Sequence, residues 1–507
     1  MKKIDKDESI KNTKNKLNIK YYDKIDDKKY KIKIQNAKLN IKTKDSNKDK
    51  NLKEIFKNIE NFKENYNEKI RDEIVKSIYN KAEDIAGNSV KKNREKFLSQ
   101  QKIDDIVTSK ITGIPIMLLL LAGILWITIE GANVPSELLA KMFFFIEDKL
   151  TQFFNYINAP SWLHGILVLG IYRTLAWVIS VMLPPMAIFF PIFTLLEDAG
   201  YLPRIAFNLD HAFKKACAHG KQALTMCMGF GCNAAGVIAC RIIESPRERL
   251  IAILTNNFVP CNGRFPTLIA LSMIFVGLKF EGSGGSSFIA TLMIVLLVLI
   301  GIGITLLVSY ILSKTLLKGV PSSFTLELPP YRKPQIGRVI YTSIIDRTIF
   351  VLMRAVVVAA PAGAIIYILG NITVGDSTIL VQVANALDPF SKAIGLDGFI
   401  LLAFILGLPA NEIVLPILIM SYLSKGAMID FESLEQLRNI LISNGWTYLT
   451  LLNTMLFSLL HFPCGTTIWT IKKETGSIKW TIFSVIMPTV IAIAVCFLTT
   501  QVYNLIV

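Results

Sequence analysis

Residues 183–270 combine segments apolar enough to enter a bilayer with repeated helix breakers. Prolines interrupt this stretch at Pro184, Pro185, Pro191, Pro260 and Pro266. Each proline removes a backbone donor, so that a carbonyl must find another partner. Inside a bilayer, such irregular backbone is stable only where it is buried in protein or lines a hydrated cavity. The stretch therefore predicts the inside of a permeation path.

The composition of the whole chain agrees with a polytopic membrane protein. The chain has 507 residues, of which 52% are hydrophobic, and a formal net charge of +16. Residues 1–110 hold 30 of the 55 Lys and Arg against 19 Asp and Glu. No nucleic-acid recognition motif accompanies these charges, and no apolar signal-peptide core is present. We expect residues 1–74 to be a partly disordered, Lys-rich cytoplasmic arm and expect no nucleic-acid partner.

The apolar segments predict an all-α fold with about eight to ten transmembrane or re-entrant helices. The arm is followed by a cytoplasmic helical linker at 75–111. Residues 112–180 are expected to hold a first span at about 113–131 and an interfacial helix at 132–160. A first repeat at 181–316 and a second at 346–507 flank a basic loop, 317–345, which the positive-inside rule places in the cytoplasm. The Pro184-Pro185 pair is expected to divide the apolar segment 161–198.

Two motifs occur in the same order in both halves. GFGCNAAGVI (229–238) resembles GLPANEIVLP (407–416), and FVPCNGR (258–264) resembles FPCGTT (462–467). Weak duplications with interrupted helices at matching places point to the binding site of a transporter. We therefore predict two pseudo-repeated halves whose broken helices meet at one site.

The seven cysteines fall in or beside apolar segments, and no C-x-x-C pair occurs, which argues against a disulfide framework. Cys232, Cys261 and Cys464 differ from the rest because helix breakers adjoin them. Thiols combined with Asn carbonyls and a carboxylate suit a borderline divalent transition metal. An ionisable group facing lipid costs at least ~2.5 kcal/mol, so Glu412 should face a pathway or a partner. The predicted metal or pathway residues are Cys232, Asn233, Cys261, Asn411, Glu412 and Cys464.

Residues that control an entrance or gate are expected at Glu197, Asp198, Arg264 and His461. Structural alternatives stay open for each group. Glu412 could pair with Arg264 or Arg354, and Cys232 and Cys261 could be packing residues at helix crossings. Glu197 and Asp198 could cap a helix end together with Arg204. His461 is either a ligand or a satisfied interior histidine.

Several motifs, taken together, resemble the membrane portion of the ferrous iron transport protein B family. They are LLEDAGYLPR, NFVPCNGRFP, LELPPYRKP and FPCGTTIWTIKKETGSIKW, and the likeness covers roughly residues 75–507. The resemblance implies two gate-type repeats, of the kind also called nucleoside-recognition domains, around an Fe²⁺ path. It also implies that the cysteines of the matching motifs, here Cys232, Cys261 and Cys464, move or gate the metal.

The chain also departs from that family's pattern. The family opens with a GTP-binding domain that carries a P-loop, whereas the Lys-rich arm stands in this position and no G-x-x-x-x-G-K-[ST] occurs. GTP and GTPase activity are therefore not expected on this chain, and a separate small G protein or accessory protein is an expected partner. Further departures fall in the pore motifs, at Ala234-Ala235, Asn262-Gly263 and Asn411-Glu412.

The sequence thus predicts a multi-pass permease of the cytoplasmic (inner) membrane with its N-terminus in the cytoplasm. It would move Fe²⁺ or a similar divalent metal inward, without a permanently bound cofactor, and a homo-oligomer stays open. One alternative is a permease for a nucleoside or another small organic solute. Another is a non-transporting membrane partner that recruits a G protein. An enzyme is not expected, because no nucleophile–base pair or closed zinc pattern is visible.

Overall fold

The computed structural model describes residues 77–82, 84–85, 94–109, 111–279, 286–318, 330–375, 377–423 and 434–506. The chain divides into two units, Met1–Asn88 and Ser89–Val507. Within the first unit, only short helical runs between residues 77 and 85 are described. The arm predicted at residues 1–74 lies outside the described residues. All that follows concerns the second unit.

The described part of the second unit is all-α apart from one small hairpin, which confirms the predicted fold class. The hairpin pairs β1 (Thr373–Val374) with β2 (Ser377–Thr378) in antiparallel register. Among the described residues, six helices are long and apolar enough to cross a membrane, or seven if one bent pair is a single span. Shorter apolar helices lie at Asn233–Ile242, Phe265–Phe275, Ile336–Ile345 and Asn411–Tyr422.

The first half of the unit begins with a helix that precedes the membrane segments and then alternates long and broken helices. Its elements are α3 (Arg94–Val107), α4 (Gly113–Tyr156), α5 (Ser161–His164), the π-helix η1 (Gly165–Tyr172), α6 (Arg173–Asp198), α7 (Leu202–Lys215), α8 (Gln222–Gly231), α9 (Asn233–Ala239), η2 (Cys240–Ile242), α10 (Pro246–Thr255), η3 (Asn256–Phe258), α11 (Phe265–Lys279) and α12 (Ser286–Lys314).

The second half repeats this order. Its elements are α13 (Ile336–Thr342), the π-helix η4 (Ser343–Ile349), α14 (Phe350–Asn371), α15 (Ile379–Ala393), α16 (Gly398–Leu406), η5 (Asn411–Ile413), α17 (Val414–Tyr422), α18 (Leu434–Ser443), α19 (Tyr448–Leu460), α20 (Gly465–Thr475) and α21 (Ile478–Ile506). A π-helix precedes both α6 and α14, and the last helices of the two halves, α12 and α21, both have 29 residues.

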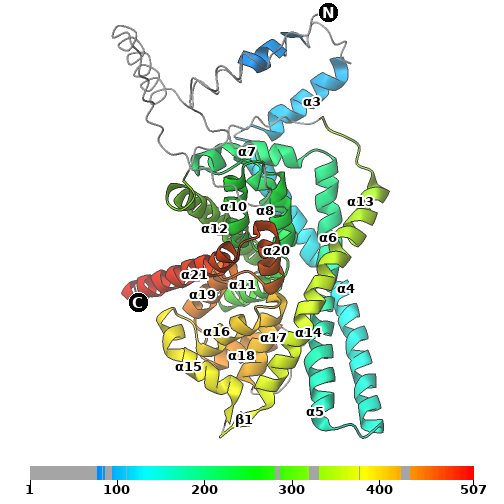
Figure 1. The fold of residues 1–507 in the computed structure, drawn as a ribbon, viewed down its shortest axis with the longest axis vertical. Coiled ribbons are helices and arrows are strands. Elements are labelled where there is room, and N and C mark those ends of the chain that lie inside the picture. The colour runs from blue at the N-terminus through cyan, green and yellow to red at the C-terminus, as the bar shows by residue number, and fades with distance from the viewer. Residues whose placement is uncertain are drawn as a thin grey trace, which may run out of the picture. The chain divides into compact units, whose positions relative to one another are not determined.

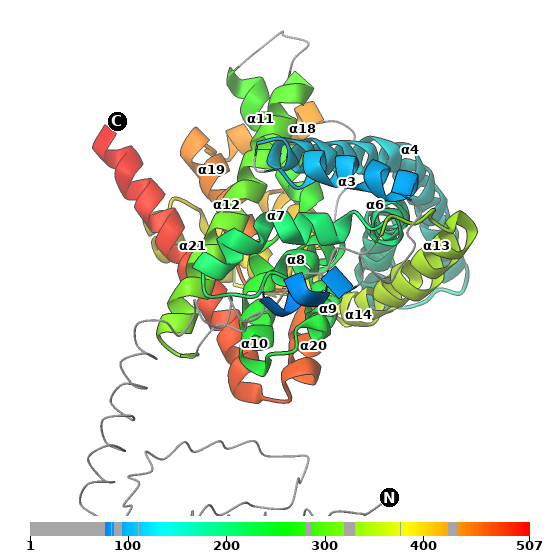
Figure 2. The same ribbon diagram turned by 90° about the horizontal axis from the view of Figure 1, so that it is seen from above.

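The helices α6 and α14 pack in opposite directions (Figure 1). Near the start of α6, Thr174 lies against Gly363, where an added Cβ would lie 2.7 Å from the Cβ of Thr174. Near its end, Thr194 accepts a hydrogen bond of 3.0 Å from Ser343 at the start of η4. Seen from above, α4, α6, α13 and α14 stand together on one side, and α12, α19 and α21 lie on the other (Figure 2). The helices α6 and α14 are therefore antiparallel, as corresponding helices are in the inverted repeats of many secondary transporters.

Two helices differ from the sequence predictions. Residues 161–198 form one continuous apolar helix with Pro184, Pro185 and Pro191 inside it, so the break expected at Pro184-Pro185 was wrong. Prolines are tolerated in membrane helices where neighbouring helices and local π turns satisfy the freed carbonyls. Here α4 lies along α6 (Figure 1) and η1 precedes it.

The expected change from a span to an interfacial helix near residue 132 is also not seen. Instead α4 runs unbroken for 44 residues through Pro135. At 1.5 Å per residue the helix is ~66 Å long, more than twice the ~30 Å hydrocarbon core of a bilayer. The apolar run at 142–145 keeps one face of the helix hydrophobic beyond the first span, so nothing in the sequence ends it there.

Candidate metal pathway

Two re-entrant hairpins bring the first repeated motif into the protein interior. In the first hairpin, α8 ends at Gly231, and Cys232 adopts an extended conformation before α9 starts at Asn233. In the second, α16 ends at Leu406, and Ala410 is extended before η5 starts at Asn411. Gly229 and Gly231 adjoin the first break, and Gly407 and Pro409 adjoin the second, and these residue types disfavour a continuous helix. Both motifs therefore form the tip of a hairpin, as their resemblance in sequence predicts.

The second repeated motif forms two further breaks. Cys261 follows Pro260 between η3 and α11. Cys464 follows Pro463 and precedes the first residue of α20, and its Sγ lies 3.3 Å from Oγ1 of Thr467. Cys464 thus stands immediately before α20. Cys261 precedes α11 by four residues, since that helix starts at Phe265.

The structure brings the three predicted thiols into one region of the interior, and Glu412 lies near two of them. Cys232, Cys261 and Cys464 lie within electrostatic range of one another, and Glu412 lies within range of Cys261 and Cys464. Nδ2 of Asn411 lies 4.0 Å from Sγ of Cys261. These groups come from four separate chain breaks, two in each repeat, and their side chains are largely hidden from solvent.

The described residues contain no set of three His, Cys, Asp or Glu side chains close enough to hold a metal ion together.

Asn233 follows Cys232 at the tip of the first hairpin, and its hydrogen bonds stabilise that tip. Its amide takes the orientation in which Nδ2 donates to the carbonyls of Val259 (3.2 Å) and Gly229 (3.3 Å). Nδ2 of Asn256 in turn donates to the Asn233 carbonyl at 3.2 Å. These bonds join the break at Cys232 to the segment that leads to Pro260 and Cys261.

Glu412 forms no salt bridge among the described residues. Its carboxylate lies directly against Gly263, where an added Cβ would overlap Oε1 and lie 2.6 Å from Cδ. Its backbone carbonyl accepts a hydrogen bond of 3.4 Å from Nε1 of Trp177. The alternative that Glu412 serves as the ion partner of Arg264 is thus not what the structure shows.

Arg264 instead cross-links the two repeats through backbone carbonyls. Its Nη1 donates to the carbonyls of Asn257 and Leu459, both at 2.8 Å. Its Nη2 donates to Oδ1 of Asn257 (3.2 Å) and to the carbonyls of His461 (3.1 Å) and Phe462 (3.2 Å). These carbonyls belong to the ends of broken helices, so Arg264 occupies oxygens that could otherwise have served a metal.

His461 is packed among aromatic rings. Its ring centroid lies 4.8 Å from that of Phe404, 5.8 Å from that of Phe457 and 5.0 Å from that of Phe462. Nδ1 lies 3.0 Å from the Phe457 carbonyl and 2.9 Å from the Ser458 carbonyl, and Nε2 has no hydrogen-bond partner. The ring is thus an interior histidine with one satisfied nitrogen.

Glu197 and Asp198 lie apart from the thiols, at two neighbouring cavities. An apolar cavity of about 550 Å³ is lined by Phe193, Glu197, Leu202, Pro203, Leu224, Met228, Ala234, Ala235, Ile238, Ala239, Ile242, Val351, Arg354 and Thr466. A polar vestibule of about 710 Å³ is lined by Thr194, Glu197, Asp198, Gly200, Pro330, Arg332, Lys333, Gln335, Arg338, Val339 and Thr342. Glu197 lines both, and the apolar cavity reaches Ala234 and Thr466, each two residues from a pathway thiol.

The contacts of Arg204 and Asp198 lead to different segments. The guanidinium of Arg204 forms a salt bridge of 3.0 Å with Asp104. Oδ2 of Asp198 accepts a hydrogen bond of 2.9 Å from the backbone N–H of Gln335. Asp198 therefore contacts the loop before α13.

Sequence reasoning missed three residues that surround the site. Trp177 holds the Glu412 backbone, Thr467 contacts the Cys464 thiol, and Gly263 makes room for the Glu412 carboxylate. Thr467 belongs to the FPCGTT motif and could have been found there. Trp177 lies in an apolar helix 235 residues from its partner, and nothing in its sequence neighbourhood marks it.

Comparison with known proteins finds two family models that match parts of the chain. A model described as "Gate: Nucleoside recognition" matches residues 179–275 and 335–478. A second model, described as the ferrous iron transport protein B C terminus, matches residues 294–346. The two segments of the first match hold all the thiols and acids described above, one segment in each half.

Full-length relatives carry the same assignment. The chain is 29% identical over 429 residues to the Fe(2+) transporter FeoB of Staphylococcus aureus (strain MSSA476), with 82% of this chain and 61% of that protein covered. It is 25% identical over 446 residues to the Fe(2+) transporter FeoB of Methanocaldococcus jannaschii, with 85% and 63% covered. The chain is thus similar to the membrane portion of ferrous iron transport protein B.

This family portion accounts for about three fifths of the length of the matched relatives. No solved structure matched the chain. The six or more long apolar helices and the gate-type segments together make it a multi-pass membrane protein.

Proposed function

We propose that the chain moves Fe²⁺, or a similar divalent transition metal, inward across the cytoplasmic membrane. One observation carries the proposal: three thiols from three separate helix breaks lie near one another in the protein interior, and the carboxylate of Glu412 lies near two of them, Cys261 and Cys464. The names of the relatives, Fe(2+) transporters, support the choice of metal.

The donor set favours a borderline metal over the common hard cations. Thiolates bind soft and borderline ions, whereas Mg²⁺ and Ca²⁺ prefer shells made of oxygen only. Glu412 supplies a hard donor beside the soft ones. Because Arg264 already binds the nearby carbonyls, the side chains that we assign to the moving ion are Cys232, Cys261, Cys464 and Glu412.

The positive-inside rule supports an orientation with the basic loop before α13 in the cytoplasm. Residues Pro330 to Gln335 of this loop line the polar vestibule. In this orientation, Glu197 and Asp198 stand at the cytoplasmic mouth, where an inward-moving ion leaves. The ion passes from the thiols to the apolar cavity beside Ala234 and Thr466, and then to Glu197.

A small accessory protein is a further expected partner. One relative, 26% identical over 443 residues and from Porphyromonas gingivalis, is a fusion of Fe(2+) transport protein A with Fe(2+) transporter FeoB. We propose that this chain, too, works with an accessory protein, and that any GTP-driven step is carried by a G protein acting on it.

The test is anaerobic uptake of labelled Fe²⁺ into proteoliposomes that contain this chain, with Mn²⁺, Zn²⁺ and uridine as competitors. Cys232→Ser is expected to abolish uptake. Cys496→Ser is the matched control, because Cys496 is also a buried thiol but lies in α21 and bonds the Asn453 carbonyl at 3.5 Å. Uptake that appears only with an added G protein and GTP would locate the motor in another chain. If the chain transported uridine and Cys232→Ser did not affect that transport, the substrate would be an organic solute rather than a metal ion.

A further inference from the structure

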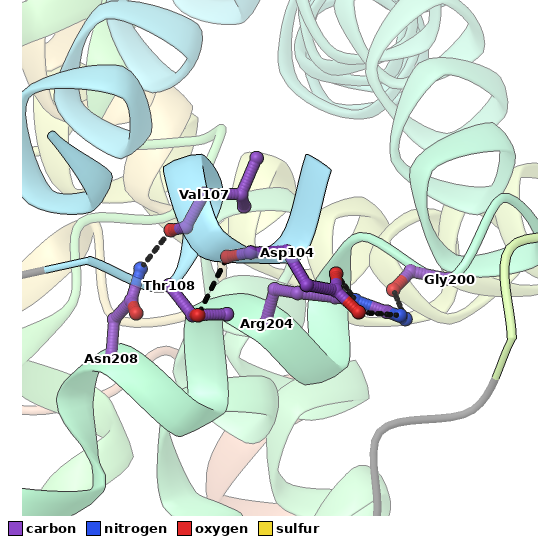
Figure 3. Close-up of polar contacts among 6 residues, drawn as sticks. All are labelled: Asp104, Val107, Thr108, Gly200, Arg204 and Asn208. Atoms are coloured by element: carbon purple, nitrogen blue, oxygen red, sulfur yellow. Dashed lines mark hydrogen bonds and ion pairs between the residues drawn. The ribbon is translucent and has the colours of Figure 1, made fainter. Parts of the chain in front are cut away.

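Arg204 of α7 joins three segments at the cavities described above. Its side chain is only 1% exposed. Nε donates to Oδ1 of Asp104 at 3.0 Å, and Nη2 donates to Oδ2 of the same carboxylate at 3.1 Å. Nη1 donates to the Gly200 carbonyl at 2.7 Å (Figure 3). The guanidinium also stacks over the ring of Tyr331, 4.0 Å from its centroid.

A second set of bonds fixes α3 on α7. Nδ2 of Asn208 donates to the Val107 carbonyl at 2.9 Å, and Oγ1 of Thr108 donates to the Asp104 carbonyl at 2.6 Å (Figure 3). Asp104 therefore belongs to a part of α3 that is itself held against α7. The hydrogen bond from Asn208 fixes the end of α3 on the next turn of α7.

The segments that Arg204 joins are walls of the two cavities. Gly200 and Pro330 both line the polar vestibule. They are held close: a Cβ at Gly200 would lie 3.2 Å from Nη1 of Arg204 and 3.6 Å from the Pro330 carbonyl oxygen. On the other face of the same turn, Leu202 and Pro203 line the apolar cavity.

Glu197 lies three residues before Gly200 and lines both cavities. The chain turns at Gly200, whose φ of +87° is a conformation that favours glycine. The position of Glu197 between the cavities consequently depends on how this turn is held. The bidentate bond to Asp104 supplies most of the fixed geometry of Arg204, because a planar guanidinium is oriented by two parallel hydrogen bonds.

We propose that Asp104 and Arg204 are positioning residues for transport, which hold the Gly200 turn so that Glu197 stands between the apolar cavity and the vestibule. The inference rests on the proposed function, since it assigns Glu197 to the path of the ion. Neither residue touches the ion. A buried guanidinium that loses the carboxylate of its salt bridge must rearrange or draw in water, and the turn that it holds would move with it.

The variants separate geometry from charge. Asp104→Asn removes the charge, and Asp104→Glu keeps it on a longer side chain. Glu137→Gln is the control for loss of an acid elsewhere, because Glu137 pairs with Lys141 on an exposed face of α4.

Two measurements are made on the full chain in proteoliposomes: Fe²⁺ uptake as a function of concentration, and hydrogen exchange followed by mass spectrometry. In Asp104→Asn we expect the maximal uptake rate to fall about tenfold, a size typical of coupling changes, while half-saturation moves less than twofold because the thiols are untouched. Amide exchange should rise at 199–207 and 330–336 but not in α19. Asp104→Glu should recover at least half of the rate.

A wild-type maximal rate in Asp104→Asn, or unchanged exchange at 199–207, would overturn the inference. Exchange that rises equally in α19 would also overturn it, because the pair would then serve general stability. If the wild type itself moves no Fe²⁺, the proposed function fails. The positioning role would in that case be decided by exchange alone, with the same two segments as the criterion.

Discussion

Cys232 and Ala410 break two helices with nearly the same extended backbone, at φ −158° and ψ 126° for Cys232 and φ −151° and ψ 121° for Ala410. An asparagine follows in each case and starts the next helical segment. Since α6 and α14 run in opposite directions, the two tips enter the unit from opposite ends. The same local conformation, used twice in inverted halves, brings both tips to one interior site.

The bases of these hairpins are closed by different chemistry. In the first, Nζ of Lys221 lies 3.4 Å from Oε1 of Glu244. In the second, the Tyr422 hydroxyl donates to Oδ2 of Asp397, and Nε1 of Trp446 donates to that hydroxyl at 2.8 Å. The two hairpins therefore share the backbone conformation of their tips, where ions would pass. The side-chain contacts that close their bases differ.

Gly263→Ala should remove metal transport without unfolding the protein. An added Cβ would overlap Oε1 of Glu412, so the carboxylate must leave its place among the thiols. We expect Fe²⁺ uptake to fall at least tenfold, since displacing a single ligand group commonly costs more than about 1.4 kcal/mol. Gly303→Ala is the control, because a Cβ there meets nothing within 4 Å. If Gly263→Ala and Gly303→Ala took up Fe²⁺ equally well, Glu412 would not be part of the ion path.

Arg264→Met should strongly destabilise the fold. The change leaves the carbonyls of Asn257, Leu459, His461 and Phe462 without the guanidinium that binds them. Breaking such a buried charged network costs about 3–5 kcal/mol, so the thermal midpoint in detergent should fall by several degrees. Arg241→Met is the control, because the side chain of Arg241, which pairs with Glu474, is 67% exposed. A midpoint unchanged in Arg264→Met would contradict the assigned brace.

The breaks in the helices could be predicted from the sequence because their cause is local. Glycine and proline beside polar residues in apolar segments mark the interruptions at Cys232, Cys261 and Cys464, and the resemblance between the halves added Asn411. The opposite error arose at Pro184-Pro185, where neighbouring helices keep the helix continuous. Proline marks a site where a helix can break, and tertiary packing decides whether it does.

The partners of the charged groups could not be predicted, because they depend on contacts between distant segments. Arg204 and Asp104 are 100 residues apart and Arg264 and Leu459 are 195 apart. Composition indicates that a buried arginine needs acceptors. It does not say whether they are carboxylates or carbonyls, and here Arg204 uses a carboxylate while Arg264 uses mainly carbonyls.

His219 should make stability depend on pH at the turn between α7 and α8. Its Nδ1 accepts a hydrogen bond of 3.0 Å from the Lys221 N–H, which requires a neutral ring. Burial lowers the pKa of His219 below its ordinary value, with Lys221 acting in the same direction and Glu248, Asp210 and Glu244 opposing it. The unfolded chain therefore binds the proton more readily, and stability is lost as the pH falls through about 6.5.

The measurement is the thermal midpoint in detergent at about pH 7.5 and about pH 5.5, either side of the ordinary histidine pKa. The wild type should lose more of its midpoint on acidification than His219→Gln, whose side chain cannot titrate. The difference should be confined to this turn, so hydrogen exchange at 217–225 should rise at the lower pH in the wild type alone. Identical pH dependence in the two proteins would remove His219 as the cause.

Tyr422→Phe should loosen the second hairpin at its base. The hydroxyl links Asp397 to Trp446, and Oδ1 of Asp397 also accepts from the Ile400 N–H at 2.6 Å. Without the hydroxyl, a partly buried carboxylate and an indole N–H each lose a partner, which costs about 1–3 kcal/mol.

The thermal midpoint of Tyr422→Phe should drop, and hydrogen exchange at 398–422 should rise while α8 and α9 are unaffected. Tyr503→Phe, on the exposed end of α21, should change neither, because its ring lies outside any such network. If protection from hydrogen exchange fell in both hairpins, the motions of their tips would be coupled through contacts at the thiols rather than independent.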